Sequence, residues 1–162
     1  MSRVPWWDGE LEYRSFGTPG APRAILVLRT GDGATIDPDV RVTSGFDVRI
    51  VTVGLDAPEL EDPPAFGGQT AAGLTVDALR DLLAREAPGT SIGLVGERSA
   101  GPIAVHLAAA MGPVVDRLAI VGVLSPTDPL SRDLHTPLLD EVAADTLVVV
   151  GGDGPAGVHD AQ

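Results

Sequence analysis

Hydrophobic residues cluster in five short runs along the chain, at residues 24–28, 48–53, 92–95, 118–124 and 146–150. Each run is rich in Val, Ile and Leu. Continuous apolar runs of this length predict strands buried on both faces, as in a parallel sheet covered by helices. Residues 10–16 alternate in polarity instead, which predicts a half-exposed strand nearer an edge. The turn-forming link at residues 17–22 favours an antiparallel hairpin into the run at 24–28.

Helical patterns and a long loop fall between the later runs. Residues 70–87 carry apolar side chains at helical spacing, and residues 101–111 are almost all small or apolar. Residues 136–144 predict a short, weakly patterned helix, and residues 54–69 predict an acidic surface loop rich in Pro and Gly. The alternation predicts an α/β fold in one domain over residues 1–162. We expect three layers: a mostly parallel sheet of about five or six strands with an antiparallel N-terminal strand, and helices on both faces.

Composition and charge narrow the function classes. The chain of 162 residues has 23 acidic and 11 basic side chains, a net charge of −12, no cysteine and no lysine. Nucleic acids and anionic membranes bind basic surfaces, so we expect neither as a partner. Without cysteine or lysine there is no thiolate metal ligand, no cysteine nucleophile and no lysine Schiff base. No apolar stretch approaches the ~20 residues of a membrane span. We expect a cytoplasmic protein that needs no metal and no cofactor.

One link between a strand and a helix carries candidate chemistry. The run at 92–95 continues through Gly96 and Glu97 to Ser99, and Gly101 opens the next helical pattern. A serine on a sharp strand-to-helix turn is exposed for nucleophilic attack, and the helix N-terminus offers N–H groups to an oxyanion. Ser99 is therefore the candidate nucleophile.

Three segments, in chain order, resemble the α/β-hydrolase-fold family. Residues 8–33 resemble its opening strands and oxyanion loop, and residues 94–101 resemble its nucleophile elbow. Residues 147–155 resemble the strand and acid-bearing turn near the end of that fold. The resemblance implies a serine hydrolase acting on a small ester or acyl substrate. Residues 125–145 leave no room for a cap domain, so the site would be lidless and open.

The resemblance also implies a role for each candidate site residue. Ser99 would attack the substrate, and Asp153 would orient a histidine that takes the serine proton. Backbone amides at Thr30, Gly31 and Ala100 would hold the oxyanion.

The histidine itself is left open by the sequence. His135 follows the fourth apolar run, and His159 follows the turn that bears the acid. His106 lies two helical turns beyond the serine, about 10 Å along the axis and out of reach for proton transfer, so we expect it to pack against the sheet. The family's histidine lies beyond a further strand and helix. We expect that segment to be absent, because the sequence ends at Gln162.

The elbow departs from the family pattern Gly-x-Ser-x-Gly. If the pattern is anchored on Gly101 the nucleophile is Ser99, and if it is anchored on Gly96 the position belongs to Arg98. Glu97 occupies the place of the first glycine, and we expect it to form an ion pair with Arg98 or another neighbour. These departures favour an alternative function, a catalytically inactive module for interaction or assembly.

A third hypothesis rests on a glycine-rich segment. Residues 31–36 partly match the Gly-x-Gly-x-x-Gly loop of dinucleotide-binding domains, with Ile36 in place of the third glycine.

The last apolar run predicts self-association. Residues 146–150 suit a strand buried on both faces, and we expect no further strand to cover them. Bare apolar edges invite pairing with another chain. We expect a homodimer that buries this edge or the adjacent face, unless Trp6 and Trp7 fold over the edge within one chain.

Overall fold

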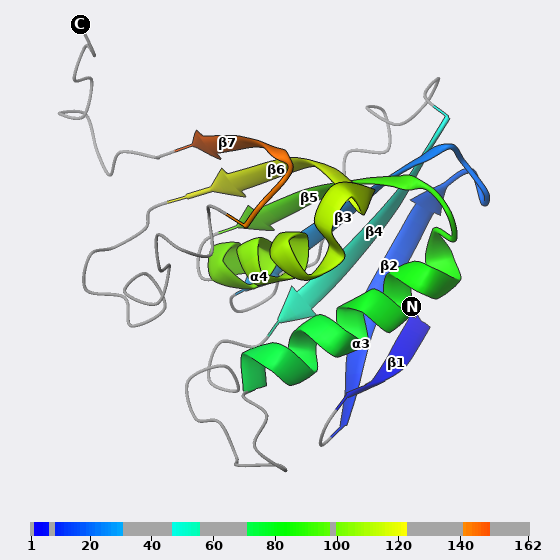
Figure 1. Ribbon diagram of the computed structural model, residues 1–162. Coiled ribbons are helices and arrows are strands. Elements are labelled where there is room, and N and C mark those ends of the chain that lie inside the picture. Colours follow the sequence, from blue (N-terminus) through cyan, green and yellow to red (C-terminus); the bar gives the residue numbers. More distant parts are fainter. Residues whose placement is uncertain are drawn as a thin grey trace, which may run out of the picture.

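The structure is a computed structural model that describes residues 2–6, 9–30, 47–55, 71–97, 100–122 and 141–149. These residues form one sheet of seven strands with two α-helices and a short 3-10 helix (Figure 1). The strands are β1 (Ser2–Trp6), β2 (Gly9–Gly17), β3 (Arg23–Thr30), β4 (Val48–Leu55), β5 (Ser91–Glu97), β6 (Val115–Val121) and β7 (Asp145–Val149). The helices are α3 (Ala71–Glu86), α4 (Gly101–Met111) and the 3-10 helix η2 (Gly112–Val114).

The sheet is mostly parallel, as predicted. Its strand order is β1-β2-β4-β3-β5-β6-β7. The strands from β4 to β7 in this order are parallel to one another, whereas β2 is antiparallel to both of its neighbours. The sheet has one strand more than expected, because the hydrophobic pattern did not predict β1. It is an edge strand in which Val4 is buried while Ser2, Arg3 and Pro5 are exposed.

The predicted hairpin between β2 and β3 is wrong, because β4 lies between them. Ile50 of β4 is registered with Phe16 on one side and with Ile25 on the other. The apolar run of β4 suits this inner position better than the half-polar sequence of β2. The link after β2 is fastened to β4, since the Thr18 amide donates to the Val48 carbonyl at 3.3 Å.

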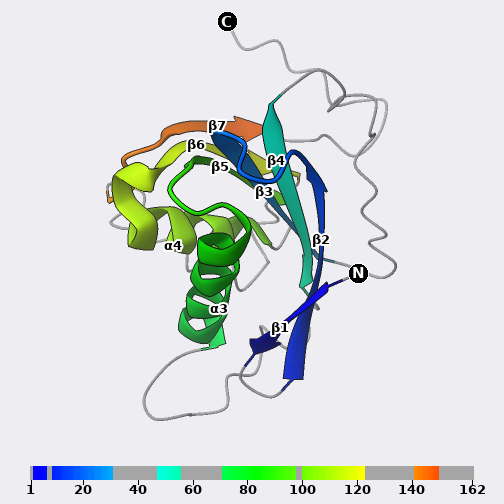
Figure 2. The same ribbon diagram turned by 90° about the vertical axis from the view of Figure 1, so that its right-hand side faces the viewer.

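Both described helices cover the same face of the sheet (Figure 2). Leu26 and Leu28 of β3 lie under them, and each is completely buried. The helix α4 contributes Ile103 and Leu107 to the same core. At the β1 edge of the sheet, the Trp6 indole donates a hydrogen bond to the Thr75 hydroxyl of α3 at 3.3 Å, and this bond fastens β1 to the helix.

Part of the predicted helical content lies outside the described residues. The opposite face of the sheet has an open groove of about 540 Å³, lined by apolar side chains that include Ile25, Val95 and Leu147. Among the described residues no helix covers that face, and the predicted second layer of helices stays a prediction. Of the helix predicted over 136–144, the described residues 141–144 are not helical. Of the loop predicted over 54–69, residues 54–55 belong to β4, and the remainder is not described.

Candidate functional site

The carboxyl ends of the central strands meet where α4 begins. β5 is parallel to β3 on one side and to β6 on the other, so all three end at the same edge of the sheet. Residues 98 and 99 are the only link between Glu97, the last residue of β5, and Ala100, the N-cap of α4. Ligands of open parallel sheets bind outside the carboxyl ends of the strands. This end of β3 and β5 is therefore the candidate site.

Two glycines allow α4 to pack closely on the sheet, Gly96 against β5 and Gly101 against β6. A Cβ atom at Gly96 would lie 2.8 Å from both the Ala104 Cβ and the Gly101 Cα. A Cβ atom at Gly101 would lie 2.9 Å from a methyl carbon of Ile120 on β6. Both anchors of the predicted elbow, Gly96 and Gly101, are thus positions where the packing requires the smallest residue.

Two of the three predicted oxyanion residues lie at this end of the sheet. Thr30 is the last residue of β3 and is 8% exposed. Ala100 is fully buried and, as an alanine, has no side-chain group that could cap α4. The first amides of a helix have no partner within the helix, and such N–H groups are suited to hold an oxyanion. The third, Gly31, lies outside the described residues, and the oxyanion assignment stays a prediction.

The ion pair expected for Glu97 is made with Arg29, a partner that the sequence did not identify, and it joins the two strand ends. Arg29 Nε lies 2.5 Å from Glu97 Oε2, and the two side chains are 36% and 29% exposed. The two residues are 68 positions apart in the sequence. Each of them follows an apolar run at the carboxyl end of a strand, which is the only indication in the sequence that they could meet.

The other candidate residues are not part of the described structure. Ser99, Arg98, His135, Asp153 and His159 all lie outside the described residues. So does the whole dinucleotide-type segment at 31–36. Their predicted roles stay predictions.

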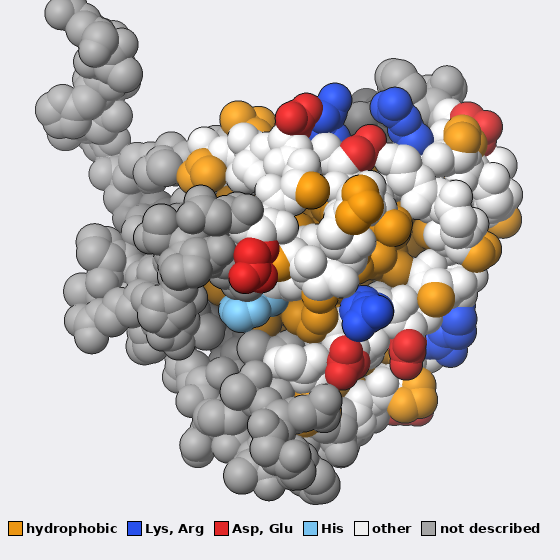
Figure 3. Space-filling view, viewed as in Figure 1, with side chains coloured by type: hydrophobic (Ala, Val, Ile, Leu, Met, Phe, Trp, Pro, Cys, Tyr) orange, Lys and Arg blue, Asp and Glu red, His pale blue; other side chains and the backbone are white. Residues whose placement is uncertain are grey.

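His106 is described and lies on α4, where it is partly buried. Within the described ranges, no three His, Asp or Glu side chains are grouped so that they could hold a metal ion. The described helices include none that is long and apolar enough to cross a membrane. Basic and acidic side chains are interspersed over the helix-covered face (Figure 3).

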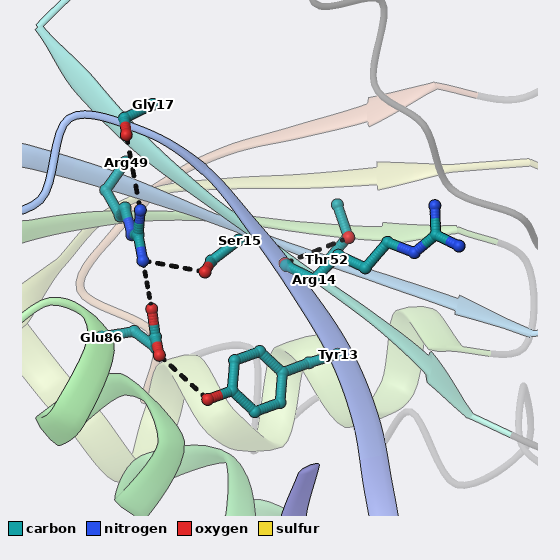
Figure 4. Close-up of polar contacts among 7 residues, drawn as sticks. All are labelled: Tyr13, Arg14, Ser15, Gly17, Arg49, Thr52 and Glu86. Atoms are coloured by element: carbon teal, nitrogen blue, oxygen red, sulfur yellow. Dashed lines mark hydrogen bonds and ion pairs between the residues drawn. The ribbon is translucent and has the colours of Figure 1, made fainter. Parts of the chain in front are cut away.

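A second polar cluster lies at the opposite end of β4 and connects three elements (Figure 4). Glu86, the last residue of α3, accepts hydrogen bonds from the Tyr13 hydroxyl at 2.9 Å and from Arg49 Nη2 at 2.6 Å. Arg49 Nη2 also lies 2.8 Å from the Ser15 hydroxyl oxygen. The buried Nε of Arg49 has no hydrogen-bond partner among the described residues. The cluster fastens the antiparallel strand β2 and the start of β4 to the end of α3.

The same contacts shift two pKa values. Burial raises the pKa of the Glu86 carboxyl, but hydrogen bonds from Arg49, Tyr13 and Ser15 outweigh burial and leave this pKa below its usual value. The pKa of the Tyr13 hydroxyl is raised, first by burial and then by its hydrogen bond to Glu86. Glu86 is therefore held as a carboxylate at neutral pH.

Known structures with the same arrangement are mainly esterases. No protein-family model and no curated protein sequence matches the chain. A zinc-bound, cold-adapted esterase from an Arctic intertidal metagenomic library superposes with a TM-score of 0.63 at 15% identity, covering 92% of this chain and 68% of that one. A serine hydrolase without a lid from Xanthomonas campestris superposes with a TM-score of 0.51 at 12% identity, covering 94% and 83% of the two chains.

A third match is a protein of unknown function from Agrobacterium tumefaciens, whose description suggests an α/β-hydrolase. Its TM-score is 0.62 at 14% identity, with 93% of this chain and 69% of that one covered. Likeness at such identities establishes the fold. The chain has the α/β-hydrolase fold.

Proposed function

We propose that the chain is a serine hydrolase that acts on small carboxylic esters, with Ser99 as its nucleophile. One observation carries the proposal: Ser99 belongs to the two-residue link between the end of β5 and the N-terminus of α4, on a fold shared with known esterases. Serine nucleophiles of α/β-hydrolases lie on the turn between a strand and a helix. Thr30, at the end of the neighbouring strand, supports the same placement.

The proposed reaction divides ester cleavage into two steps. The Ser99 oxygen attacks the ester carbonyl carbon while a histidine takes the hydroxyl proton, and the amides at Thr30, Gly31 and Ala100 stabilise the oxyanion. The intermediate collapses, the proton passes to the leaving alcohol, and an acyl group remains on the serine oxygen. Water then releases the acid by the reverse proton transfers. His159 or His135 is the base, and Asp153 is the acid that orients it.

A fluorophosphonate probe tests the proposal directly, because it reacts with an activated serine. We expect mass mapping of the labelled protein to place the adduct on Ser99, and Ser99→Ala to remove it. The variant should also lower hydrolysis of p-nitrophenyl acetate by at least about 10³-fold while leaving the melting temperature unchanged. Ser91→Ala, at the other end of β5, is the matched control and should keep both activities. Equal hydrolysis by wild type and Ser99→Ala would end the proposal.

The candidate bases can be separated with two further variants. If His159 is the base, His159→Ala should lose labelling nearly as fully as Ser99→Ala, whereas His135→Ala should keep it. The opposite result assigns the base to His135. Full labelling of both variants would show that neither His159 nor His135 is the catalytic base.

A second candidate function is a catalytically inactive module, and the packing of Gly96 favours it. The close contact of Gly96 with α4 fits an elbow anchored on this glycine, in which Arg98 takes the nucleophile's place. An arginine there cannot attack an ester. Under this alternative the native wild-type protein is not labelled by the fluorophosphonate, and Ser99→Ala changes nothing.

A further inference from the structure

The hydrogen-bonded register between β3 and β5 ends before the strands do. The last registered pair is Leu28 with Gly96. Beyond it, Arg29 is registered only with Gly54 of β4, and Glu97 is registered only with Val121 of β6. The ends of β3 and β5 are therefore not registered with each other where the candidate site begins.

The Arg29–Glu97 ion pair spans this gap. Arg29 Nε lies 2.5 Å from Glu97 Oε2, so the two side chains form a direct charge-assisted hydrogen bond. Thr30 directly follows the arginine, and Ser99 is two residues beyond the glutamate. The pair therefore connects the backbone that leads into the candidate oxyanion residues with the backbone that leads into the candidate nucleophile.

The pair lies on the face of the sheet away from α4. Side chains alternate along a strand, and Gly96, the residue before Glu97, faces α4, where its missing Cβ leaves room for Ala104. Glu97 therefore points to the other face, as does Arg29, which follows the buried Leu28. This explains how a glutamate is accepted at the end of β5: its side chain does not enter the space between β5 and α4.

We propose that Arg29 and Glu97 are positioning residues, which fix the distance between the end of β3 and the turn that carries Ser99. This inference rests on the proposed function, in which both segments contribute to one site. The pair would act through the backbone and would not contact the substrate. Errors of about 1 Å in the placement of reacting groups can cost about 10²-fold in rate, so a modest tie has a measurable effect.

Amide hydrogen exchange tests the tie without requiring activity. We expect Glu97→Gln and Arg29→Met to speed exchange at the Thr30 and Ala100 amides by about tenfold, while the amides of Leu26 and Leu94 stay protected. The swapped variant Arg29→Glu/Glu97→Arg should restore slow exchange. The matched control is Asp145→Asn, which removes another ion pair between parallel strands, that of Arg117 with Asp145, and should leave Thr30 and Ala100 unchanged. Unchanged exchange at both amides in Glu97→Gln would overturn the proposal.

Turnover of p-nitrophenyl acetate then separates positioning from general stability. We expect Glu97→Gln to lower kcat by about 10- to 100-fold with KM changed less than about twofold, and the swapped variant to regain most of kcat. A wild-type kcat in Glu97→Gln, or a loss seen only in KM, would overturn the positioning role. If wild type is neither labelled at Ser99 nor active, the proposed hydrolase function fails, and the exchange result alone decides whether the pair ties the strand ends.

Discussion

A Cβ atom at Gly96 would meet the Ala104 Cβ and the Gly101 Cα at 2.8 Å and the Ala100 carbonyl oxygen at 3.0 Å. Real Cβ atoms do not approach backbone this closely, so any larger residue must push α4 away from β5. Overpacking of this kind costs about 1–3 kcal/mol. Gly96 lies both in the packing between β5 and α4 and next to the candidate site, so a larger residue there affects both.

Gly96→Ala should therefore destabilise the protein and disturb the candidate site together. We expect a lower free energy of unfolding by about 1–3 kcal/mol, measured by urea denaturation. The matched control is Gly54→Ala, in β4, where an added Cβ meets nothing within 4 Å. Equal stability of the Gly96 variant and the control would contradict the packing described.

Glu86 should make stability depend on pH. Its pKa in the folded state lies below the usual value, so the carboxylate stabilises the fold above the unfolded pKa of about 4.3, and this contribution is lost as the pH falls through the folded pKa. We expect Glu86→Gln to cost about 1–3 kcal/mol at pH 7, and the gap to wild type to shrink towards pH 3. Urea denaturation across this range measures both. Asp81→Asn, on the same helix, is the control, and a gap independent of pH would refute the assignment.

At the scale of elements, apolar runs predicted the central strands well. β3, β4, β5 and β7 each lie within two residues of a predicted run, because continuous sequence rich in Val, Ile and Leu favours strands. The predicted burial on both faces is wrong for β7, whose Leu147 and Val148 are exposed. β6 begins and ends three residues earlier than predicted, since Asp116 and Arg117 interrupt its apolar pattern. β1 was missed because an edge strand buries little and so leaves little pattern.

Strand order and cross-strand contacts could not be predicted in this way. The expected hairpin assumed that neighbours in sequence pair in space, whereas β4 takes the place beside β2. β5 and the start of α4 were predicted from the run at 92–95 and the helical pattern that begins at Gly101, whereas the role of Ser99 between them stays a prediction. The Arg29–Glu97 pair was not predicted, because the contact exists only once β3 and β5 are known to be adjacent.

For the whole molecule, the exposed edge at β7 bears on assembly. Among the described strands β7 pairs only with β6, and its Leu147 and Val148 are 61% and 50% exposed on opposite faces. In the alternative, Trp6 and Trp7 fold over this edge within one chain. This is wrong for β1, which contains Trp6 and pairs with β2 at the other end of the sheet. Trp7 lies outside the described residues.

We expect the chain to form a two-fold dimer through the β7 edge, because an unpaired apolar strand gains hydrogen bonds and burial by meeting its own copy. Leu147→Lys should weaken dimerisation by more than about tenfold, equivalent to about 1.4 kcal/mol, as measured by sedimentation at micromolar concentration. Val114→Lys is the matched control, since Val114 is 46% exposed on η2, outside the β7 edge. A monomeric wild type, or a dimer that Leu147→Lys leaves intact, would exclude this interface.

The strand order also dictates when the chain can fold as it leaves the ribosome. β1 and β2 can pair at once across a link of two residues, but β3, at the centre of the sheet, has both of its partners later in the chain. Its β5 partner is synthesised more than sixty residues after it, as the register of Ala24 with Ile92 requires. Closing such a long loop costs chain entropy before any contact compensates for it, and this slows folding. Once β4 has paired with β2 and β3, the other edge of β3 stays open until β5 emerges, and this open edge exposes the nascent chain to aggregation.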